Sequence, residues 1–453
     1  MKRKMVLIGA GSAMFTQGVV LDLIKNPGGF EWELCLVDID EQVLEGTERL
    51  VRKILKHKDA DIKLSAEVDR KRALPGADYV VCTIGVGGRR AWEQDVFIPR
   101  KYGIFQPVGD TAMPGGISRA MRMVPAMIDI VDDCVRLCPK ARFFNYSNPM
   151  AVICRAIYKA RNYPMTGLCI GVPGSEWELA DLIGVPRSEF RTVAVGVNHM
   201  TFIYKMYVDG QDAKPMIDAA LKEKGIGVYA DGMNDKFFET YDETDGFKSI
   251  GDPYAYTFYQ NHGAFPAPGD RKITEFMTAQ FPGGAYYGRT LGVNAYSFEG
   301  TISSGDKIHE HMMQVGNSPE PIDEEYFKHI HGEHELLMDI INAMEHDSRK
   351  VFSVNLPNRG AVTNLPYDAV LELPAIATAD GFRTIQINDF PQSLAGYVLK
   401  ALNIFELTVD AALQCDRNLF IEAILAGGYL PDRKKVESMV DELMQAQVQY
   451  LPR

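Results

Sequence analysis

The start of the chain carries the pattern that most constrains its fold. A short apolar segment at residues 5–9 ends in Gly9, Gly11 follows two positions later, and an apolar-periodic segment begins at Thr16. In a strand–turn–helix unit of this kind, the first glycine permits a tight turn and the second lets the backbone approach a pyrophosphate. The N-terminus of the following helix points free N–H groups at that anion. The pattern therefore predicts a dinucleotide site, with a plain packing turn as the alternative.

A second apolar segment, at residues 33–38, ends in an acid that supports this interpretation. Asp38 is placed to hold the ribose hydroxyls of an adenosine, and an acid at this position favours NAD over NADP. Met14 stands where the third glycine of the usual fingerprint would be. The residues predicted to bind the cofactor are Gly9, Gly11, Ser12 and Asp38.

The first part of the chain alternates short apolar segments with helical ones. This alternation predicts an α/β fold with a doubly wound parallel sheet of the Rossmann type. We expect an NAD-binding domain at residues 1–160, with a loop at residues 85–90 that faces the ligand. The predicted strands are residues 5–9, 34–38, 78–84 and 142–146, and the predicted helices are residues 41–57 and 116–136.

The rest of the chain, residues 161–453, is expected to form a second α/β domain that binds substrate and metal. Residues 192–208 are rich in Val, Thr, Ile and Tyr, which is typical of strands. Residues 225–300 are irregular and rich in Gly, Pro and Tyr, and helices dominate from residue 322 onward. We therefore expect a mixed domain with a helical C-terminal part.

Composition and charge narrow the class of partner. A chain of 453 residues with 46% hydrophobic and 24% charged residues is typical of a soluble protein with a large core. The net charge of −12 argues against nucleic acid and anionic membranes as partners. The apolar run after the basic start is too short for an export signal or a membrane span, which predicts a cytoplasmic protein. The seven cysteines form no Cys-x-x-Cys pair, so we expect reduced thiols.

Three residues with side chains that could bind a metal or transfer a proton lie in separate loops of the second part: Cys169, His199 and Asp270. A thiolate and a neutral imidazole are suitable ligands for a transition metal, and two protein ligands leave positions open for substrate oxygens. Each residue alone also has a plain structural interpretation. A cysteine in an apolar run is usually a small core residue, and a histidine near a strand end usually has an ordinary hydrogen-bond partner.

Seven segments in order carry a resemblance that covers nearly the whole chain. They resemble family 4 of the glycoside hydrolases, whose members need both NAD and a divalent metal, usually manganese. The resemblance implies a fold related to lactate and malate dehydrogenases, and association into homodimers or homotetramers. The segments are residues 9–12, 103–116, 145–149, the loop of Cys169, and residues 196–199, 268–271 and 364–366.

The resemblance implies hydrolysis of an α-linked sugar by elimination instead of direct displacement. NAD oxidises C3 of the sugar, the new ketone acidifies the proton at C2, and a base removes that proton. The aglycone then leaves from C1, water adds, and the hydride returns. A metal that grips the C2 and C3 oxygens stabilises the enolate, and the cofactor performs the difficult step.

The resemblance also assigns roles to individual residues. Cys169 and His199 match the metal ligands of the family, and Asp270 matches a carboxylate that serves as the C2 base in some members. In other members a tyrosine is the base, and three tyrosines stand in reserve just upstream: Tyr254, Tyr256 and Tyr259. A turn carboxylate is the structural alternative for Asp270.

Two further residues are predicted to bind the substrate. Asn148 matches an asparagine near the substrate hydroxyls, although an Asx turn before Pro149 would explain it equally. Arg271, together with Arg89 and Arg90, is suited to clamp a uronate carboxylate in a bidentate manner, whereas contact with the dinucleotide phosphates is the alternative. The preferred substrate is therefore an α-galacturonide or α-galactoside, a small-molecule sugar.

One position departs from the family. Ile170 follows the cysteine where many relatives carry Asp, Asn or His, and isoleucine cannot donate a proton to the leaving aglycone. Another group such as His262 then has to supply that proton, or the leaving group needs little help.

Two other functions stay open. One is an ordinary NAD-linked dehydrogenase of a sugar or hydroxy acid, and the other is a sugar-sensing protein without turnover.

Overall fold

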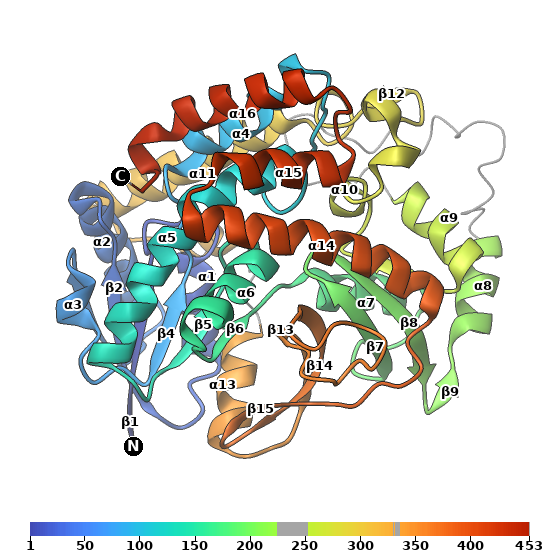
Figure 1. The fold of residues 1–453 in the computed structure, drawn as a ribbon. Helices are drawn as coiled ribbons and strands as arrows, with labels where there is room; N and C mark the ends of the chain where they lie inside the picture. Colours follow the sequence, from blue (N-terminus) through green and yellow to red (C-terminus); the bar gives the residue numbers. More distant parts are fainter. Residues whose placement is uncertain (224–251, 329, 331–335, 453) are drawn as a thin grey trace.

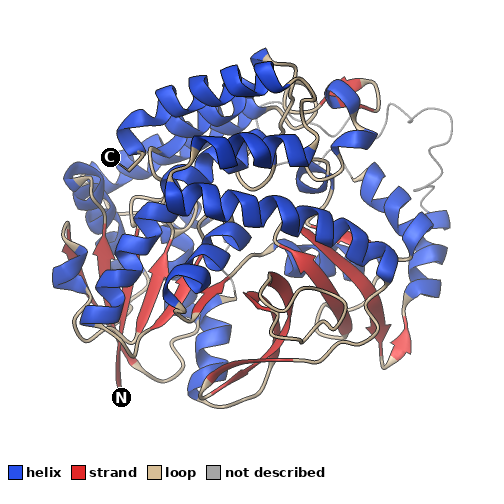
Figure 2. Cartoon of the chain, viewed as in Figure 1, coloured by secondary structure: helices blue, strands red, loops and turns tan. Residues whose placement is uncertain are grey.

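The computed structural model describes residues 1–223, 252–328, 330 and 336–452 (Figure 1). The first part of the predicted irregular stretch at 225–300 lies outside the described residues. The fold is dominated by one sheet of 13 strands, over which the helices pack (Figure 2). A separate pair of short strands is formed by β11, Ala285–Tyr286, and β12, Arg289–Thr290.

The N-terminal part is the predicted doubly wound parallel sheet. Its strands lie in the order β3-β2-β1-β4-β5-β6, all parallel, which is the order of dinucleotide-binding folds. The strands are β1 Lys2–Ile8, β2 Glu31–Val37, β3 Ile62–Glu67, β4 Tyr79–Cys82, β5 Arg142–Asn145 and β6 Met165–Gly167. The helices between them are α1 Thr16–Lys25, α2 Glu41–His57, α3 Arg70–Ala73, α4 Gly88–Lys101, α5 Met113–Leu137 and α6 Met150–Arg161.

The central strands of this part are apolar along their length. All four residues of β4 are buried, and so are residues 5–8 of β1, because helices cover both faces of a parallel sheet. The predicted helix at 41–57 has the bounds of α2, and Asp40 caps it by accepting hydrogen bonds from Gln42 N and Val43 N. The fold class is thus as predicted from the sequence.

Two elements of this part differ from the prediction. The edge strand β3 was missed because its residues Ile-Lys-Leu-Ser-Ala-Glu are only partly buried and show no apolar run. Residues 85–90 were predicted as a loop, but α4 already begins at Gly88. Gly87, with φ of 76°, precedes that helix, so the glycines mark a helix start as well as a turn.

The second part of the chain continues the same sheet with antiparallel strands. The order is β6-β13-β14-β7-β8-β10, and the two parts join where Asn355 of β13 pairs with Gly167 of β6. β6 lies beyond residue 160 and still pairs in parallel with β5, so the parallel sheet extends past the predicted boundary at 160. The division into two domains at that residue stays a prediction. The strands are β7 Phe190–Val197, β8 Met200–Val208, β9 Gln211–Asp212, β10 Phe265–Ala267, β13 Val351–Pro357, β14 Val370–Thr378 and β15 Gly381–Thr384.

Three long C-terminal helices pack over the parallel part, as the red ribbons of Figure 1 show. They are α14 Gln392–Gln414, α15 Arg417–Gly427 and α16 Arg433–Gln447, and α14 packs against α5 and α6. The other helices are α7 Gly171–Ile183, α8 Lys214–Glu223, α9 Pro253–His262, α10 Asp270–Ile273, α11 Phe298–Asn317, α12 Glu324–Phe327 and α13 Leu337–Glu345. None of the described helices has the length and apolarity of a membrane span.

A fully buried ion pair ties α5 to its neighbours. Arg122 of α5 donates from Nη1 and Nη2 to the carboxylate of Asp95 on α4, at 2.9 and 2.6 Å. Ser118 donates to the same carboxylate at 2.8 Å, and Gln447 of α16 donates to the carbonyl of Ala91. Since a buried pair is costly to break, these contacts hold the start of α5, beside the site described next, in one position.

Candidate functional site

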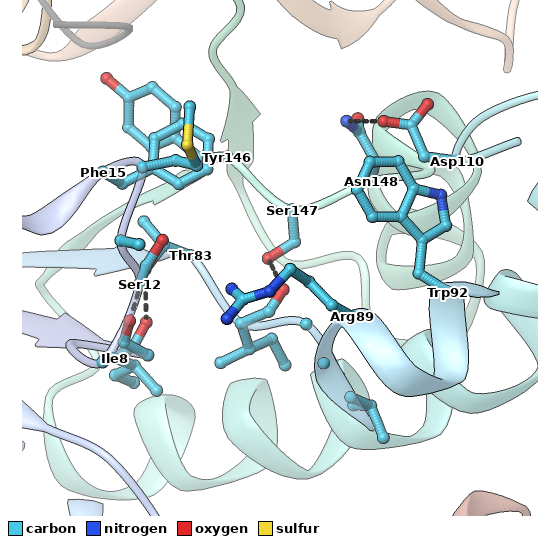
Figure 3. Close-up of a pocket in the computed structure, with 18 of the residues that line it drawn as sticks. Ile8, Ser12, Phe15, Thr83, Arg89, Trp92, Asp110, Tyr146, Ser147 and Asn148 are labelled. Carbon is cyan, nitrogen blue, oxygen red and sulfur yellow. Dashed lines mark hydrogen bonds between the residues drawn. The ribbon is translucent and has the colours of Figure 1, made fainter. Parts of the chain in front are cut away.

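A cavity of about 1350 Å³ lies at the carboxyl ends of the parallel strands (Figure 3). It extends from the glycine turn after β1 to the loops that carry Cys169 and His199. Open α/β sheets bind their ligands at this edge. The structure therefore brings the predicted cofactor residues and the predicted metal ligands to opposite ends of one cavity, which we call the cofactor end and the metal end.

The cofactor end is formed mainly by backbone. Gly9 N donates to Val37 O at 2.8 Å, and Gly9 has a φ of 90°, which a residue with a side chain rarely adopts. Gly11 N donates to Asp38 Oδ2 at 2.8 Å, and a Cβ atom on Gly11 would lie only 2.9 Å from that oxygen. Glycine at these two positions thus lets the turn pack directly against Asp38 and the neighbouring strand, which fits the tight turn of a dinucleotide site.

The side chains around this turn complete the fit. The four residues predicted to bind the cofactor, Gly9, Gly11, Ser12 and Asp38, all line the cavity. The Asp38 carboxylate also accepts from Asp40 N at 3.1 Å and keeps lone pairs for ribose hydroxyls. Ile39 and Val68, 89% and 44% exposed, border the same space and offer apolar contact for a purine ring.

The metal end contains the cysteine and the histidine predicted as ligands. Cys169 lies between β6 and α7, and its Sγ accepts a hydrogen bond from Gly171 N at 3.3 Å. His199 lies in the turn between β7 and β8 with a φ of 68°. Both residues line the cavity. An uncommon left-handed backbone at a histidine points to a functional constraint on its position.

Burial sets the protonation of both groups. It raises the pKa of Cys169 to about 12, and the charge of Glu372 adds to this effect. It also lowers the pKa of His199 to about 3, helped by the charge of Lys272, so the imidazole is neutral at pH 7. A neutral imidazole is the form that binds a metal, and a buried thiol gives up its proton when a cation takes its place. The pair therefore fits a divalent transition metal.

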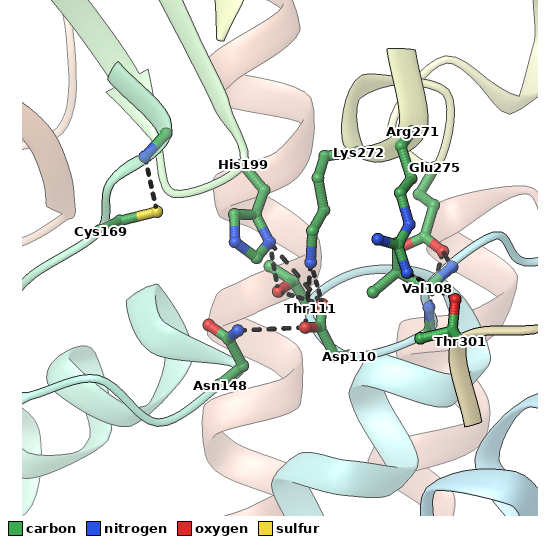
Figure 4. Close-up of polar contacts among 12 residues, drawn as sticks. Val108, Asp110, Thr111, Asn148, Cys169, His199, Arg271, Lys272, Glu275 and Thr301 are labelled. Atoms are coloured by element: carbon green, nitrogen blue, oxygen red, sulfur yellow. Dashed lines mark hydrogen bonds and ion pairs between the residues drawn. The ribbon is translucent and has the colours of Figure 1, made fainter. Parts of the chain in front are cut away.

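Asn148 lies beside these two residues, on the loop after β5. Its Nδ2 donates to Asp110 Oδ2 at 3.1 Å. Its Oδ1 is buried and has no hydrogen-bond partner among the described residues. Figure 4 shows this oxygen turned toward the side of the cavity from which Cys169 approaches. Since a buried polar atom without a partner is costly, Asn148 Oδ1 fits contact with a bound group.

Asp110 connects the residues of the metal end, and the sequence analysis assigned it no role. Its carboxylate accepts from Thr111 Oγ1 at 2.9 Å and from Lys272 Nζ at 3.0 and 3.2 Å, besides Asn148. Burial opposes its charge, but the positive charges of Lys272 and Arg119 hold its pKa well below the usual range. The available signal was its place in the segment 103–116 that carries the family resemblance.

A second buried acid holds the loop of Asp110. Glu275 Oε1 accepts from Val108 N at 2.8 Å and from Gly109 N at 2.7 Å, and the side chain is 1% exposed. Burial, with the nearby charge of Asp110, raises the pKa of Glu275 to about 7. Lys272 and Glu275 therefore fasten this loop through Asp110, Val108 and Gly109, as Figure 4 shows.

Asp270 does not join this group. It is 0% exposed and does not line the cavity. Its carboxylate accepts from Tyr254 N at 2.8 Å, Ala255 N at 2.7 Å and Tyr286 Oη at 2.5 Å, so it holds the start of α9. Burial and the neighbouring Asp252 raise its pKa well above the usual range. This position does not fit the predicted base, because a base must reach the proton that it removes.

The other residues predicted as the base or the proton donor also lie outside the cavity. The three tyrosines Tyr254, Tyr256 and Tyr259 belong to α9 and do not line the cavity. His262 packs on Phe258, with ring centroids 4.2 Å apart, and does not line the cavity either. Ile170 does line it and adds an apolar wall beside Cys169. The sequence could not reveal these directions, because they depend on how α9 docks on the second part of the sheet.

The predicted arginines separate into two groups. Arg271 lines the metal end and donates from Nη2 to Thr301 Oγ1 at 2.9 Å. Arg89 and Arg90 lie on α4, and both form ion pairs with Asp306 of α11, whereas Arg271 contacts Thr301 of the same helix. A cation that the sequence analysis missed, Arg119 of α5, lines the cavity and donates from Nε to Asn148 O at 3.0 Å.

The Rossmann sheet, the glycine turn and the cavity at its carboxyl edge define a dinucleotide-binding α/β enzyme. The sequence profile of the Family 4 glycosyl hydrolases matches residues 4–185, and the profile of the C-terminal domain of that family matches residues 194–427. The chain belongs to family 4 of the glycosyl hydrolases, as the resemblance predicted.

Curated relatives span nearly the whole chain. An alpha-glucosidase of Erwinia rhapontici is 28% identical over 477 residues, which cover 100% of this chain and 99% of the relative. An alpha-galactosidase of Rhizobium meliloti is 28% identical and covers 99% and 89%. An alpha-galacturonidase of Lachnoclostridium phytofermentans is 27% identical and covers 99% and 97%.

Solved structures share the fold. A 6-phospho-alpha-glucosidase from gut microorganisms, crystallised with NAD and Mn²⁺, superimposes with a TM-score of 0.82 at 19% identity over 100% of both chains. Malate dehydrogenase of Cryptosporidium parvum gives a TM-score of 0.53 at 14% identity, with 91% of this chain and 100% of that chain covered. The predicted relation to the malate dehydrogenase fold is therefore confirmed at the level of the fold.

Proposed function

We propose that the chain hydrolyses an α-linked glycoside, with an α-galacturonide or α-galactoside as substrate, in a reaction that uses NAD and a divalent metal, Mn²⁺ in first place. The observation that carries this proposal is the convergence of Cys169, His199 and Asn148 in the cavity that begins at the glycine turn, where Asn148 Oδ1 has no partner among the described residues. Relatives named for hydrolysis of α-linked sugars, and a fold neighbour crystallised with NAD and Mn²⁺, support it.

Each end of the cavity has its own task in this proposal. Gly9, Gly11 and Asp38 bind the dinucleotide, which supplies reversible oxidation of the sugar at C3. Cys169 and His199 hold the metal, which supplies a Lewis acid that makes the proton at C2 of the oxidised sugar acidic. Asn148 Oδ1 accepts from a sugar hydroxyl or adds a ligand at the same place.

In this proposal Lys272, and not Asp270, is the general acid–base group. Its Nζ borders the metal end, where Asp110 holds it at 3.0 Å, whereas the Asp270 carboxylate is turned to α9. General acid–base groups contribute on the order of 10²–10⁴-fold to rates. The variant Lys272→Met should lose that factor, while Lys71→Met, a lysine lining the cofactor end, should not. Equal activity of both variants would remove Lys272 from the proposal.

The charge of the metal end supports an anionic substrate. Among the described residues that line it, the cations are Arg119, Arg271 and Lys272, and the acid that they surround is Asp110. An excess of positive charge suits a sugar with a carboxylate, and an arginine binds such a group through two hydrogen bonds. We therefore place the α-galacturonide before the neutral α-galactoside. Arg271→Met should then lower kcat/KM for the galacturonide more than for the galactoside.

One experiment tests the reaction itself. The reduced protein is incubated in deuterium oxide with NAD, Mn²⁺ and a panel of nitrophenyl α-glycosides that includes the α-galacturonide. The expected result is cleavage with deuterium at C2 of the released sugar, lost when NAD or metal is withheld. Cleavage without deuterium contradicts the elimination route. Net formation of NADH without cleavage favours a dehydrogenase, and binding without turnover favours a sensor.

A further inference from the structure

We infer that Asp110 is the positioning residue of the metal end: it orients Asn148 and His199 so that an amide oxygen and an imidazole lone pair face the metal. This inference rests on the proposed function, since it concerns the metal that the proposal places there. The inference goes beyond the proposed function because it explains how the side chains of Asn148 and His199 acquire their orientation. The Asp110 carboxylate accepts hydrogen bonds from Asn148, Thr111 and Lys272, as Figure 4 shows.

The amide of Asn148 can be placed in two ways that exchange its oxygen and nitrogen. An ionised carboxylate accepts hydrogen bonds and donates none, so Asp110 Oδ2, at 3.1 Å, selects the orientation with Nδ2 toward it. The amide oxygen then has to point away from Asp110, into the buried position where it has no partner among the described residues. Without Asp110, the amide is free to turn its N–H₂ group toward a cation, which repels it.

The imidazole of His199 is oriented through one intermediate. Thr111 Oγ1 lies 2.9 Å from Asp110 Oδ1 and 2.8 Å from His199 Nδ1. A hydroxyl has a single proton, and because Thr111 donates it to the carboxylate, the hydroxyl has to accept from His199 Nδ1–H. The proton of the neutral imidazole therefore resides on Nδ1, and Nε2 keeps the lone pair that a metal needs.

Asp110 is itself held in place on two sides. Lys272 Nζ contacts both carboxylate oxygens, at 3.2 and 3.0 Å, and Glu275 binds the backbone N–H groups of Val108 and Gly109 just before it. The Asp110 carboxylate thus contacts Asn148 and Lys272 directly and His199 through Thr111. Partners of this kind behind metal ligands typically change metal affinity by about 10–100-fold when they are lost.

The test measures binding of Mn²⁺ to the reduced protein without sugar, from the electron paramagnetic resonance signal of free Mn²⁺. Thr111→Val keeps the shape of the side chain but cannot relay the hydrogen bond, whereas Thr111→Ser keeps the hydroxyl. We expect Thr111→Val and Asp110→Asn to weaken Mn²⁺ binding about tenfold or more. Thr111→Ser should restore wild-type affinity, which a merely structural role of the position would not predict.

Two controls separate this effect from damage to the fold. Asp306→Asn removes another acid that lines the cavity and pairs with Arg90, and it should leave Mn²⁺ affinity unchanged. NAD affinity should be the same in wild type and in both Thr111 variants. If Asp110→Asn does not fold, the comparison of Thr111→Val with Thr111→Ser decides the question alone.

The outcomes distinguish this inference from the proposed function. If the wild-type protein binds no Mn²⁺, both fail. If the wild type binds Mn²⁺ and Thr111→Val and Asp110→Asn bind it within twofold of wild type, the inference on Asp110 fails and the proposed function stands. Loss in Thr111→Val together with recovery in Thr111→Ser supports both.

Discussion

The two ends of the cavity are built in different ways. The cofactor end uses the backbone of one short segment, with Gly9 and Gly11 as its decisive residues and Asp38 close behind in the sequence. The metal end uses side chains from separate segments, which meet at Asp110: besides its neighbour Thr111, its partners Asn148 and Lys272 lie 38 and 162 positions away. The comparison teaches that a local site is tolerant of its surroundings, whereas a convergent site depends on every segment that contributes to it.

The largest expected effect is at the metal end. Cys169→Ser replaces the thiolate, a strong metal ligand, with a hydroxyl that stays protonated. Activity should be abolished, while NAD binding at the other end should stay within about twofold of the wild type. Turnover with NAD and Mn²⁺ and titration of NAD by protein fluorescence check the two statements. Full activity of Cys169→Ser would remove the metal assignment and with it the contrast between the two ends.

A substitution at the cofactor end should give the converse result. The Cβ of Gly11→Ala would lie 2.9 Å from Asp38 Oδ2 and 2.4 Å from Val43 Cγ1. Crowding of this kind costs about 1–3 kcal/mol, so NAD affinity should fall by roughly tenfold or more. Mn²⁺ affinity measured without NAD should be unchanged. A parallel loss of Mn²⁺ binding would mean that the two ends are not independent.

A change at Asp38 should sharpen the description of the cofactor end. Asp38→Asn keeps the shape but removes the charge that accepts from Gly11 N and from ribose hydroxyls. Hydrogen bonds to charged groups contribute about 1.5–3 kcal/mol, so NAD should bind roughly tenfold more weakly. The preference for NAD over NADP should decrease as well, because the charge that repels a 2′-phosphate is gone. An unchanged NAD to NADP ratio would argue against Asp38 as the ribose acid.

The smallest effect is expected at Asp270. Both oxygens of Asp270 accept a backbone N–H, so Asp270→Asn keeps one acceptor for the start of α9 and sets its N–H₂ group against the other N–H, which should cost about 1–3 kcal/mol of stability. Its kcat should stay within a few-fold of wild type. Thermal unfolding and steady-state kinetics give the two values. A kcat lowered by about 10²-fold or more would restore Asp270 as the base.

The same comparison explains what the sequence could predict. The glycine turn and its helix were predicted correctly, because strand, turn and helix follow one another within residues 2–25. The family and its fold followed from ordered motifs. The segment 103–116 was noted, but not Asp110 within it, because its partner Lys272 is 162 positions away and only the folded sheet brings the two together.

The direction of each side chain was the other property that the sequence could not predict. Asp270 stands next to Arg271 and Lys272 in the sequence, yet its carboxylate turns to α9 while the two cations line the cavity. In a short helix such as α10, neighbouring side chains leave in different directions, and packing decides which one faces the ligand. A pattern of residue types cannot state this, since it contains the residues but not the neighbours against which they pack.

The pairing of Gly167 with Asn355 has a consequence for substrate exchange. Because this contact makes the parallel and antiparallel strands one sheet, the separation between the glycine turn and the metal end is set by strand geometry and not by a hinge. Opening the site by rotating one half against the other would break the sheet. Entry and exit of ligands then have to proceed through movement of loops and side chains above a rigid base, and different ligands can be accommodated there without changing the separation between the glycine turn and the metal end.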